Sequence, residues 1–285
     1  MAQPSDTIVR AVTQDQAFRV LVASTTQTVQ GATSAQRGTG RTARCFGDLL
    51  TATVLFRQTM APGLRVQGIL RAADGKSAMV ADSHPSGATR GLIQPAGDSA
   101  DFDLGAGALL QMMRTLQDGR VNQGVVAVGQ PPSVSQALMS YMQTSEQTVT
   151  MAAVGTLLEG DTVTASGGYL VQLLPDAPRD SLMIMTERLQ DFRSVDPQLA
   201  HPEFSPSWLL SELLHGMPFD QTAEEAVRYE CWCDELRVVA ALATLDRAEL
   251  AELVSPGKVL EISCDYCGKE FRIPPGRLKG LLNDS

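Results

Sequence analysis

The chain has 285 residues, a length typical of two domains or of one large domain with an appendage. Its hydrophobic fraction is 44% and its charged fraction 19%, and no apolar stretch approaches the roughly 18 residues needed to span a bilayer. The net charge of -9 disfavours nucleic-acid binding, because an acidic protein without a local basic patch repels phosphates. We therefore expect a globular protein with neither membrane nor nucleic acid among its partners.

The start of the chain and its cysteine content indicate the compartment. Residues 1–6 hold no basic region followed by an apolar one, which is the pattern of a secretion signal. Five cysteines in a chain of this length also argue against a secreted disulfide scaffold. We expect a cytoplasmic protein whose cysteines serve metal or redox chemistry.

Residues 1–178 have the pattern of a mixed domain. Short apolar runs predict strands, apolar residues at helical spacing predict helices, and two alternating runs around a turn at Gly75 predict a hairpin. The expected strands are 7–10, 17–23, 64–70 and 78–82, and the expected helices are 43–57 and 133–143. This order indicates an α+β fold with one antiparallel sheet packed by a few helices.

Residues 179–228 form the acidic middle of the chain. Ten carboxylates stand against three arginines between residues 180 and 230, so most of the net charge lies there. A helix is expected at 179–193, and four prolines break up the rest, yet residues 208–214 are too apolar for a disordered linker. Two interpretations stay open, namely a segment that folds only by docking on another surface and a connector that is always folded.

The last part, residues 229–285, is small. Its pattern predicts short helices at 234–243 and 247–253, a hairpin over 259–273 and a final helix after Pro275. A unit of this size seldom buries enough apolar surface to be stable alone. We therefore expect a crosslink within it.

Four of the five cysteines lie in this part as two close pairs, Cys231 with Cys233 and Cys264 with Cys267. Two such pairs separated by a foldable insert supply the four thiolates of a tetrahedral zinc site, and Gly268 favours the turn of a zinc knuckle. We predict one zinc ion per chain, with structural disulfides or free thiols as the alternatives. Four thiolates would close the site to water, which argues against hydrolytic zinc catalysis.

The spacing of the cysteines also points to redox chemistry. A disulfide between Cys231 and Cys233 would be strained and therefore easily reduced. Thiolates on zinc remain nucleophilic towards peroxide or hypochlorous acid, and disulfide formation would remove the crosslink that folds this part. Oxidation would then unfold residues 229–285 locally.

Signatures of catalysis are weak in the rest of the chain. Residues 38–43 loosely match a dinucleotide fingerprint, but no strand leads into them, and the three histidines are scattered. Cys45 lies in a helical pattern and is expected to be a small buried hydrophobe. A thiol-disulfide oxidoreductase acting through Cys264 and Cys267 lacks its βαβ context. We expect no catalytic residue and no enzyme.

Five stretches match the motifs of one known family. They are Tyr-Glu-Cys-Trp-Cys at 229–233, Cys-Asp-Tyr-Cys-Gly at 264–268, Tyr-Met-Gln-Thr-Ser-Glu-Gln at 141–147, Gly-Gly-Tyr-Leu-Val-Gln-Leu-Leu-Pro at 167–175 and, more weakly, Thr-Arg-Gly at 89–91. Through these motifs, its length and its acidic charge, the chain resembles the 33-kDa heat-shock protein family of redox-regulated holdase chaperones over essentially its whole length.

The resemblance implies a switch. In the reduced state Cys231, Cys233, Cys264 and Cys267 would hold zinc and the protein would be inactive. Oxidation would join Cys231 to Cys233 and Cys264 to Cys267 and release the zinc. The linker of about residues 180–230 would then unfold, and the protein, as a homodimer, would capture unfolding client proteins without ATP.

We therefore expect an N-terminal α+β domain for client binding and dimerisation at 1–178, a metastable helical linker at 179–228 and a zinc-binding redox switch at 229–285. Two residues depart from the family pattern, Trp232 inside the first cysteine pair and Asp234 where the family often has Ser. The alternative function is a constitutive zinc-ribbon-like adaptor for protein or nucleic acid, of which the net charge disfavours the second.

Overall fold

The chain forms two compact units in a computed structural model, Met1–Glu230 and Cys231–Ser285. The structure describes residues 5–95, 102–116, 118–254 and 258–283. The first four residues, part of the segment over which no leader is expected, lie outside the described residues. Within the described ranges, no helix combines the length and the apolar character needed to cross a membrane.

The first unit contains every strand and helix expected there, with shifted ends. Its strands are β1 Thr7–Thr13, β2 Phe18–Ser24, β3 Arg65–Arg71, β4 Ala78–Ser83, β5 Ala88–Gln94, β6 Leu109–Thr115, β7 Val121–Ala127, β8 Thr150–Glu159, β9 Thr162–Leu173, β10 Phe219–Ala226 and β11 Arg228–Tyr229. Its helices are α1 Thr26–Gln36, α2 Gly40–Thr59, α3 Val134–Thr144, α4 Arg179–Arg188, α5 Asp196–Leu199 and α6 Pro206–Leu213. The sequence pattern did not predict α1 or the strands from β5 to β11. The sequence of α1 is largely polar, so its pattern carries little helical signal.

The expectation of one sheet is wrong, because the strands of the first unit form two sheets. One has five strands in the order β10-β1-β2-β9-β8, and the other has six in the order β11-β5-β4-β3-β6-β7. All pairings are antiparallel except that of β11 with β5. A period-2 pattern shows that a run is a strand but does not show which neighbour it pairs with.

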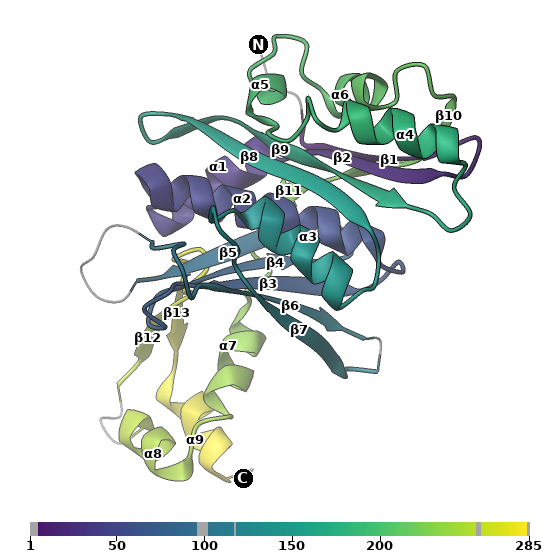
Figure 1. Cartoon of the computed structure of the whole chain (residues 1–285). Coiled ribbons are helices and arrows are strands. Elements are labelled where there is room, and N and C mark those ends of the chain that lie inside the picture. Colours follow the sequence, from purple (N-terminus) through teal and green to yellow (C-terminus); the bar gives the residue numbers. More distant parts are fainter. Residues whose placement is uncertain (1–4, 96–101, 117, 255–257, 284–285) are drawn as a thin grey trace. The chain divides into compact units, whose positions relative to one another are not determined.

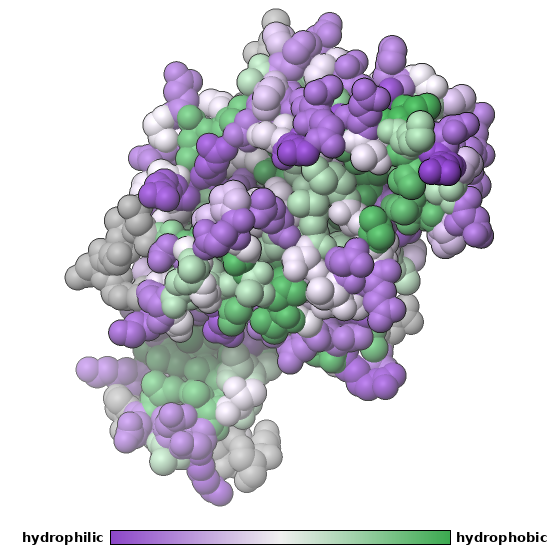
Figure 2. All heavy atoms as spheres, viewed as in Figure 1, coloured by the Kyte–Doolittle hydropathy of each residue, from purple (hydrophilic) through white to green (hydrophobic). Residues whose placement is uncertain are grey.

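Helices α1, α2 and α3 lie between the two sheets (Figure 1). Helix α2 is the centre of this core, since its Phe46, Leu49 and Leu55 are fully buried and belong to one cluster with β3, β4, β6 and β9. Figure 2 shows that the visible surface of this unit is largely hydrophilic, with smaller hydrophobic patches between. The α+β class is therefore confirmed, with a buried helical layer that holds the two sheets together.

The outer face of the five-stranded sheet is covered by the acidic middle of the chain, as Figure 1 shows for α4, α5 and α6. Leu209, Leu210 and Leu213 of α6 are almost completely buried in a second apolar cluster, which they share with strand residues such as Val20 and Val22. Helix α4 ends at Arg188, earlier than expected, and its Leu182, Met183 and Ile184 are exposed, while its Met185 is buried. The middle segment is thus anchored by α6 more than by α4.

The last two strands of the first unit pair with one strand in each of its two sheets. Strand β10 pairs with β1 along its whole length, and β11 then pairs with β5 of the other sheet. Glu225 of β10 accepts a 2.7 Å hydrogen bond from Gln58 and lies 3.8 Å from the Arg57 guanidinium and 4.0 Å from that of Arg10. These contacts hold the residues just before Cys231 in place.

Gly87 leaves room for the chain where it runs from β10 in one sheet to β11 in the other. Its φ is +84°, and a Cβ built on it would lie 2.1 Å from the backbone oxygen of Ala226. We expect Gly87→Ala to lower the free energy of unfolding by about 1–3 kcal/mol more than Gly75→Ala, because a backbone atom must move aside. Gly75 is a matched control, since its φ is +68° and nothing lies within 4 Å of its added Cβ. Urea denaturation of both variants measures the difference, and equal losses would contradict the expectation.

The second unit contains the elements expected for it. They are α7 Glu235–Leu242, α8 Arg247–Val254, β12 Leu260–Ser263, β13 Glu270–Ile273 and α9 Pro275–Asn283. Strands β12 and β13 form an antiparallel hairpin. Among the described residues, Leu242, Phe271, Ile273 and Leu278 form its buried hydrophobic cluster, and Leu250 of α8 is buried as well. So small a core gives little stability of its own.

Candidate metal centre

The four clustered cysteines come from two short segments of the second unit. Cys231 and Cys233 lie just before α7, while Cys264 and Cys267 lie in the turn between β12 and β13. This turn is closed by backbone hydrogen bonds in which the Cys267 N–H donates to the Cys264 carbonyl at 3.2 Å and the Gly268 N–H donates to it at 2.7 Å. Gly268 has a φ of +71°, a region that favours glycine, so the predicted knuckle turn is present.

The four cysteine sulfur atoms lie close together. The Sγ atoms of Cys231 and Cys264 are 3.8 Å apart and those of Cys233 and Cys267 are 3.4 Å apart. All four sulfurs lie within 4.8 Å of one another. A tetrahedral ion with metal–sulfur bonds of about 2.3 Å separates its ligands by about 3.8 Å. The arrangement therefore fits a metal ion bound by four thiolates.

The surroundings of the sulfurs favour neutral thiols when no metal is bound. Burial raises the pKa of the Cys233 thiol, and a hydrogen bond to Cys267 raises it further. Burial also raises the pKa of Cys267. A neutral thiol is a poor nucleophile, whereas a bound metal ion requires the thiolate form. Metal binding therefore removes the thiol protons and keeps these cysteines in their nucleophilic thiolate form.

The centre adjoins the core of the second unit. Cys233 and Cys264 pack against the cluster formed by Leu242, Phe271 and Ile273. Asp234, one of the departures from the family pattern, is the N-cap of α7, and its carboxylate accepts a 2.8 Å hydrogen bond from the Arg237 N–H. Serine is also a good N-cap, so this departure keeps the start of α7 intact.

The four cysteines predicted to form a site are thus brought together, and Cys45 is not among them. Cys45 lies on α2 in the first unit, partly buried, and burial raises the pKa of its thiol. A thiol with such a pKa is a poor nucleophile. The sequence did not show that the residues of the linker cover the outer face of the five-stranded sheet. The signal for them was the apolar run at 208–214, which lacked an identified partner.

Comparisons with known proteins agree on one family. The model of a family described as "Hsp33 protein" matches residues 6–274. The "33 kDa chaperonin" of Thermoanaerobacter sp. (strain X514) is 28% identical, covering 97% of this chain and 98% of the relative. The "33 kDa chaperonin" of Syntrophotalea carbinolica is 26% identical over 97% of this chain and 99% of the relative. The crystal structure of a 33 kDa chaperonin from Thermotoga maritima superposes with a TM-score of 0.81 at 20% identity, covering 99% of each chain.

Proposed function

The chain belongs to the Hsp33 protein family, and we propose that it is a redox-regulated chaperone that holds unfolding client proteins without ATP and catalyses no reaction. Its curated relatives are named chaperonins, which supports a chaperone role. We assign the three parts as a client-binding and dimerisation domain at 1–178, a metastable linker at 179–228 and a redox switch at 229–285. The active form is a homodimer, and the protein works in the cytoplasm.

One observation carries the proposal, namely the apolar sheet face that the linker covers. Strand residues such as Val20, Val22 and Tyr169 are fully buried only because α6 and its neighbours lie on them. An unfolding protein also exposes apolar surface, and two apolar surfaces associate in water. Release of the linker would therefore create a binding surface for clients. Strand β10 is the linker's other anchor, and it is polar and largely exposed. A segment held in this way can be released at moderate cost.

The cysteines of the second unit supply the switch. Zinc, when bound, would hold Cys231, Cys233, Cys264 and Cys267 as thiolates and crosslink the two halves of that unit. A thiolate attacks peroxide to give a sulfenic acid, and the neighbouring thiolate displaces it to form a disulfide. In forming each disulfide, two thiolates pass two electrons to one peroxide molecule, which takes up two protons and becomes two waters. We assign the disulfides to Cys231 with Cys233 and to Cys264 with Cys267, as the family resemblance implies.

Oxidation would then destabilise the fold of the second unit. Disulfides supply no thiolates, so the second unit loses its crosslink and keeps only a core of a few side chains. Residues 229 and 230 connect the linker to this unit, which begins at Cys231. Unfolding that starts in residues 231–285 would spread into the linker and uncover the sheet face.

The test follows zinc and activity in the same sample. Zinc per chain is measured with a colorimetric chelator before and after treatment with peroxide and mild heat, while light scattering follows an aggregating client protein. We expect about one zinc ion to be released per chain together with suppression of aggregation, and dithiothreitol to reverse both. Zinc that stays bound, or that leaves without any gain in holding activity, would contradict the proposal.

A constitutive zinc-ribbon-like adaptor is the second candidate, favoured by the small hairpin unit that carries the cysteines. It predicts that the reduced protein binds its partner and that oxidation abolishes binding. Salt-dependent binding of the reduced chain to DNA or RNA would support it. The net charge of -9 weighs against nucleic acid as the partner.

A further inference from the structure

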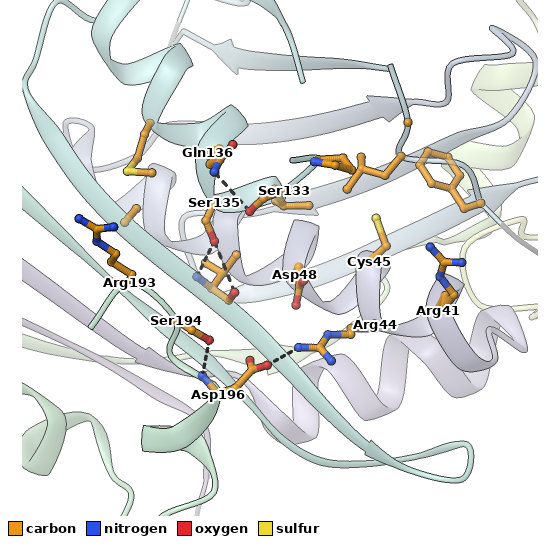
Figure 3. A pocket seen from close by; sticks show the side chains of 18 of the residues that line it. Arg41, Arg44, Cys45, Asp48, Ser133, Ser135, Gln136, Arg193, Ser194 and Asp196 are labelled. Carbon is orange, nitrogen blue, oxygen red and sulfur yellow. Dashed lines mark hydrogen bonds and ion pairs between the residues drawn. The ribbon is translucent and has the colours of Figure 1, made fainter. Parts of the chain in front are cut away.

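A cavity of about 640 Å³ lies in the first unit, away from the cysteines of the switch. It is bounded by α2, the segment around Asp103, the start of α3, strand β8 and the linker residues 193–196. Figure 3 shows Cys45 and Asp48 on its α2 side, across from Ser133, which precedes α3, and Ser135 of α3. Its volume is that of a pocket for a small molecule.

At the start of α3, backbone N–H groups that line the cavity can donate hydrogen bonds to a ligand. The Ser133 side chain caps the helix by accepting from the Gln136 N–H. The N–H groups of Val134 and Ser135 belong to the first turn, where no carbonyl of the helix can accept from them, and the described residues give them no other partner. The first turn of an α-helix with free N–H groups attracts anions.

Arginines stand at both ends of the cavity, as Figure 3 shows for Arg41 and Arg193. Arg41 is exposed and, within the described part of the chain, has no hydrogen bond or ion pair. Arg193 donates a hydrogen bond to the neutral Gln190 side chain. Arg44, between them, pairs with Asp196. Among the described residues, Arg41 and Arg193 thus have no carboxylate partner.

Asp48 supplies an unused polar atom. Its Oδ1 is buried and has no hydrogen-bond partner in the structure. Burial raises the pKa of this carboxyl to about 8, while a hydrogen bond from Thr156 and the charge of Arg44 lower it and the charge of Asp196 raises it. Cys45, the other titratable group beside Asp48, is neutral because burial raises its pKa. Near pH 7 Asp48 is therefore a neutral hydrogen-bond donor.

We propose that this cavity binds a small organic anion, a carboxylate or a phosphate ester. Its charged group lies against the first turn of α3 and the free arginines, and its carbon body contacts Met139, Met151 and Val154, which line the same cavity. Three arginines line this cavity against two carboxyl groups besides Asp48. Asp196 pairs with Arg44, and Asp103 accepts from the Gly105 N–H. The excess of guanidinium groups over these carboxyl groups favours an anion.

Occupancy of the cavity also bears on the linker, and this consequence rests on the proposed function. Residues 193–196 belong to the linker, while the other walls belong to the domain it covers. A ligand that contacts both stabilises the docked linker by the ratio of its affinities for the docked and undocked forms. Loss of the Arg193 contact alone makes this ratio about tenfold, so a saturating ligand favours the docked form by about that factor. Activation by oxidant would then be slower in the presence of the ligand.

The test uses isothermal titration calorimetry of the reduced, zinc-loaded full chain, with citrate, adenosine monophosphate and inorganic phosphate as probes. We expect citrate or the nucleotide to bind at one per chain, and inorganic phosphate to bind more weakly because it lacks a carbon body. R41Q and R193Q are each expected to weaken binding about tenfold or more, since each removes a charge-assisted hydrogen bond. R71Q, at the exposed end of β3 and outside the cavity, is the matched control and should bind like the unaltered chain.

A pH series tests Asp48 separately. Above about pH 8 Asp48 becomes charged, so it no longer donates and repels an anion, and affinity should fall. In D48N the side chain stays neutral and affinity should not fall. The inference is overturned if citrate and the nucleotide both fail to bind at one per chain, if R41Q and R193Q bind like R71Q, or if D48N shows the same fall. No client or oxidant is present, so these results do not depend on the chaperone proposal.

Discussion

A chain in which Cys264 and Cys267 are both replaced by Ser is expected to bind no zinc and to lose the fold of residues 231–285. Two of the four sulfurs that lie within 4.8 Å of one another would be gone. Zinc bound by four thiolates contributes on the order of 10 kcal/mol to the folding of small units at pH 7. The few buried side chains of this unit offer no comparable stabilisation. The second unit should therefore be unfolded even under reducing conditions.

Zinc content and amide hydrogen exchange measure this result. Amides of α7, β12 and β13 should exchange at the rate of an unfolded chain, while the strands of the first unit stay protected. Cys45→Ser is the matched control, because the same chemical change outside the cluster should leave zinc content unaltered. A double variant that kept one zinc per chain, or that kept protected amides in residues 231–285, would show that the crosslink is not what folds this unit.

Replacing Leu209 and Leu213 by Ala is expected to make the reduced, zinc-loaded chain active in holding client proteins. Both side chains are completely buried between α6 and the five-stranded sheet. Each buried Leu→Ala change costs about 2–5 kcal/mol, and here the cost falls on the contact between linker and sheet. The linker should then leave the sheet without oxidation and uncover the apolar face.

Limited proteolysis of residues 179–228 and the light-scattering assay should change together. The matched control is the pair Leu182→Ala and Ile184→Ala on α4 of the same linker, whose side chains are 40% and 48% exposed. That pair should leave the linker resistant to protease in the reduced state, because it removes little buried surface. If the Leu209 and Leu213 variant released its linker and yet held no client, the covered sheet face would not be the binding surface.

Features of this protein that depend on neighbours along the chain could be predicted from its sequence. The spacing of Cys231 with Cys233 and of Cys264 with Cys267 predicted the cluster that the structure forms, because each pair needs only a short turn to aim both sulfurs at one point. The pattern of α2 was equally readable, since its apolar residues recur at the period of the helix. Length, charge and these motifs also pointed to the family that the comparisons identify.

Contacts between distant segments were decided only by the tertiary structure. Strand β10 is polar and mostly exposed, so its sequence carries no strand pattern, and it is a strand because β1 offers it an edge to pair with. The apolar run in α6 showed that something must bury it, but not that the outer face of a sheet does so. Asp48 and Arg193 meet at one cavity although they lie far apart along the chain. Local spacing sets local geometry, whereas strand pairing and burial depend on which surfaces remain available once the whole chain has folded.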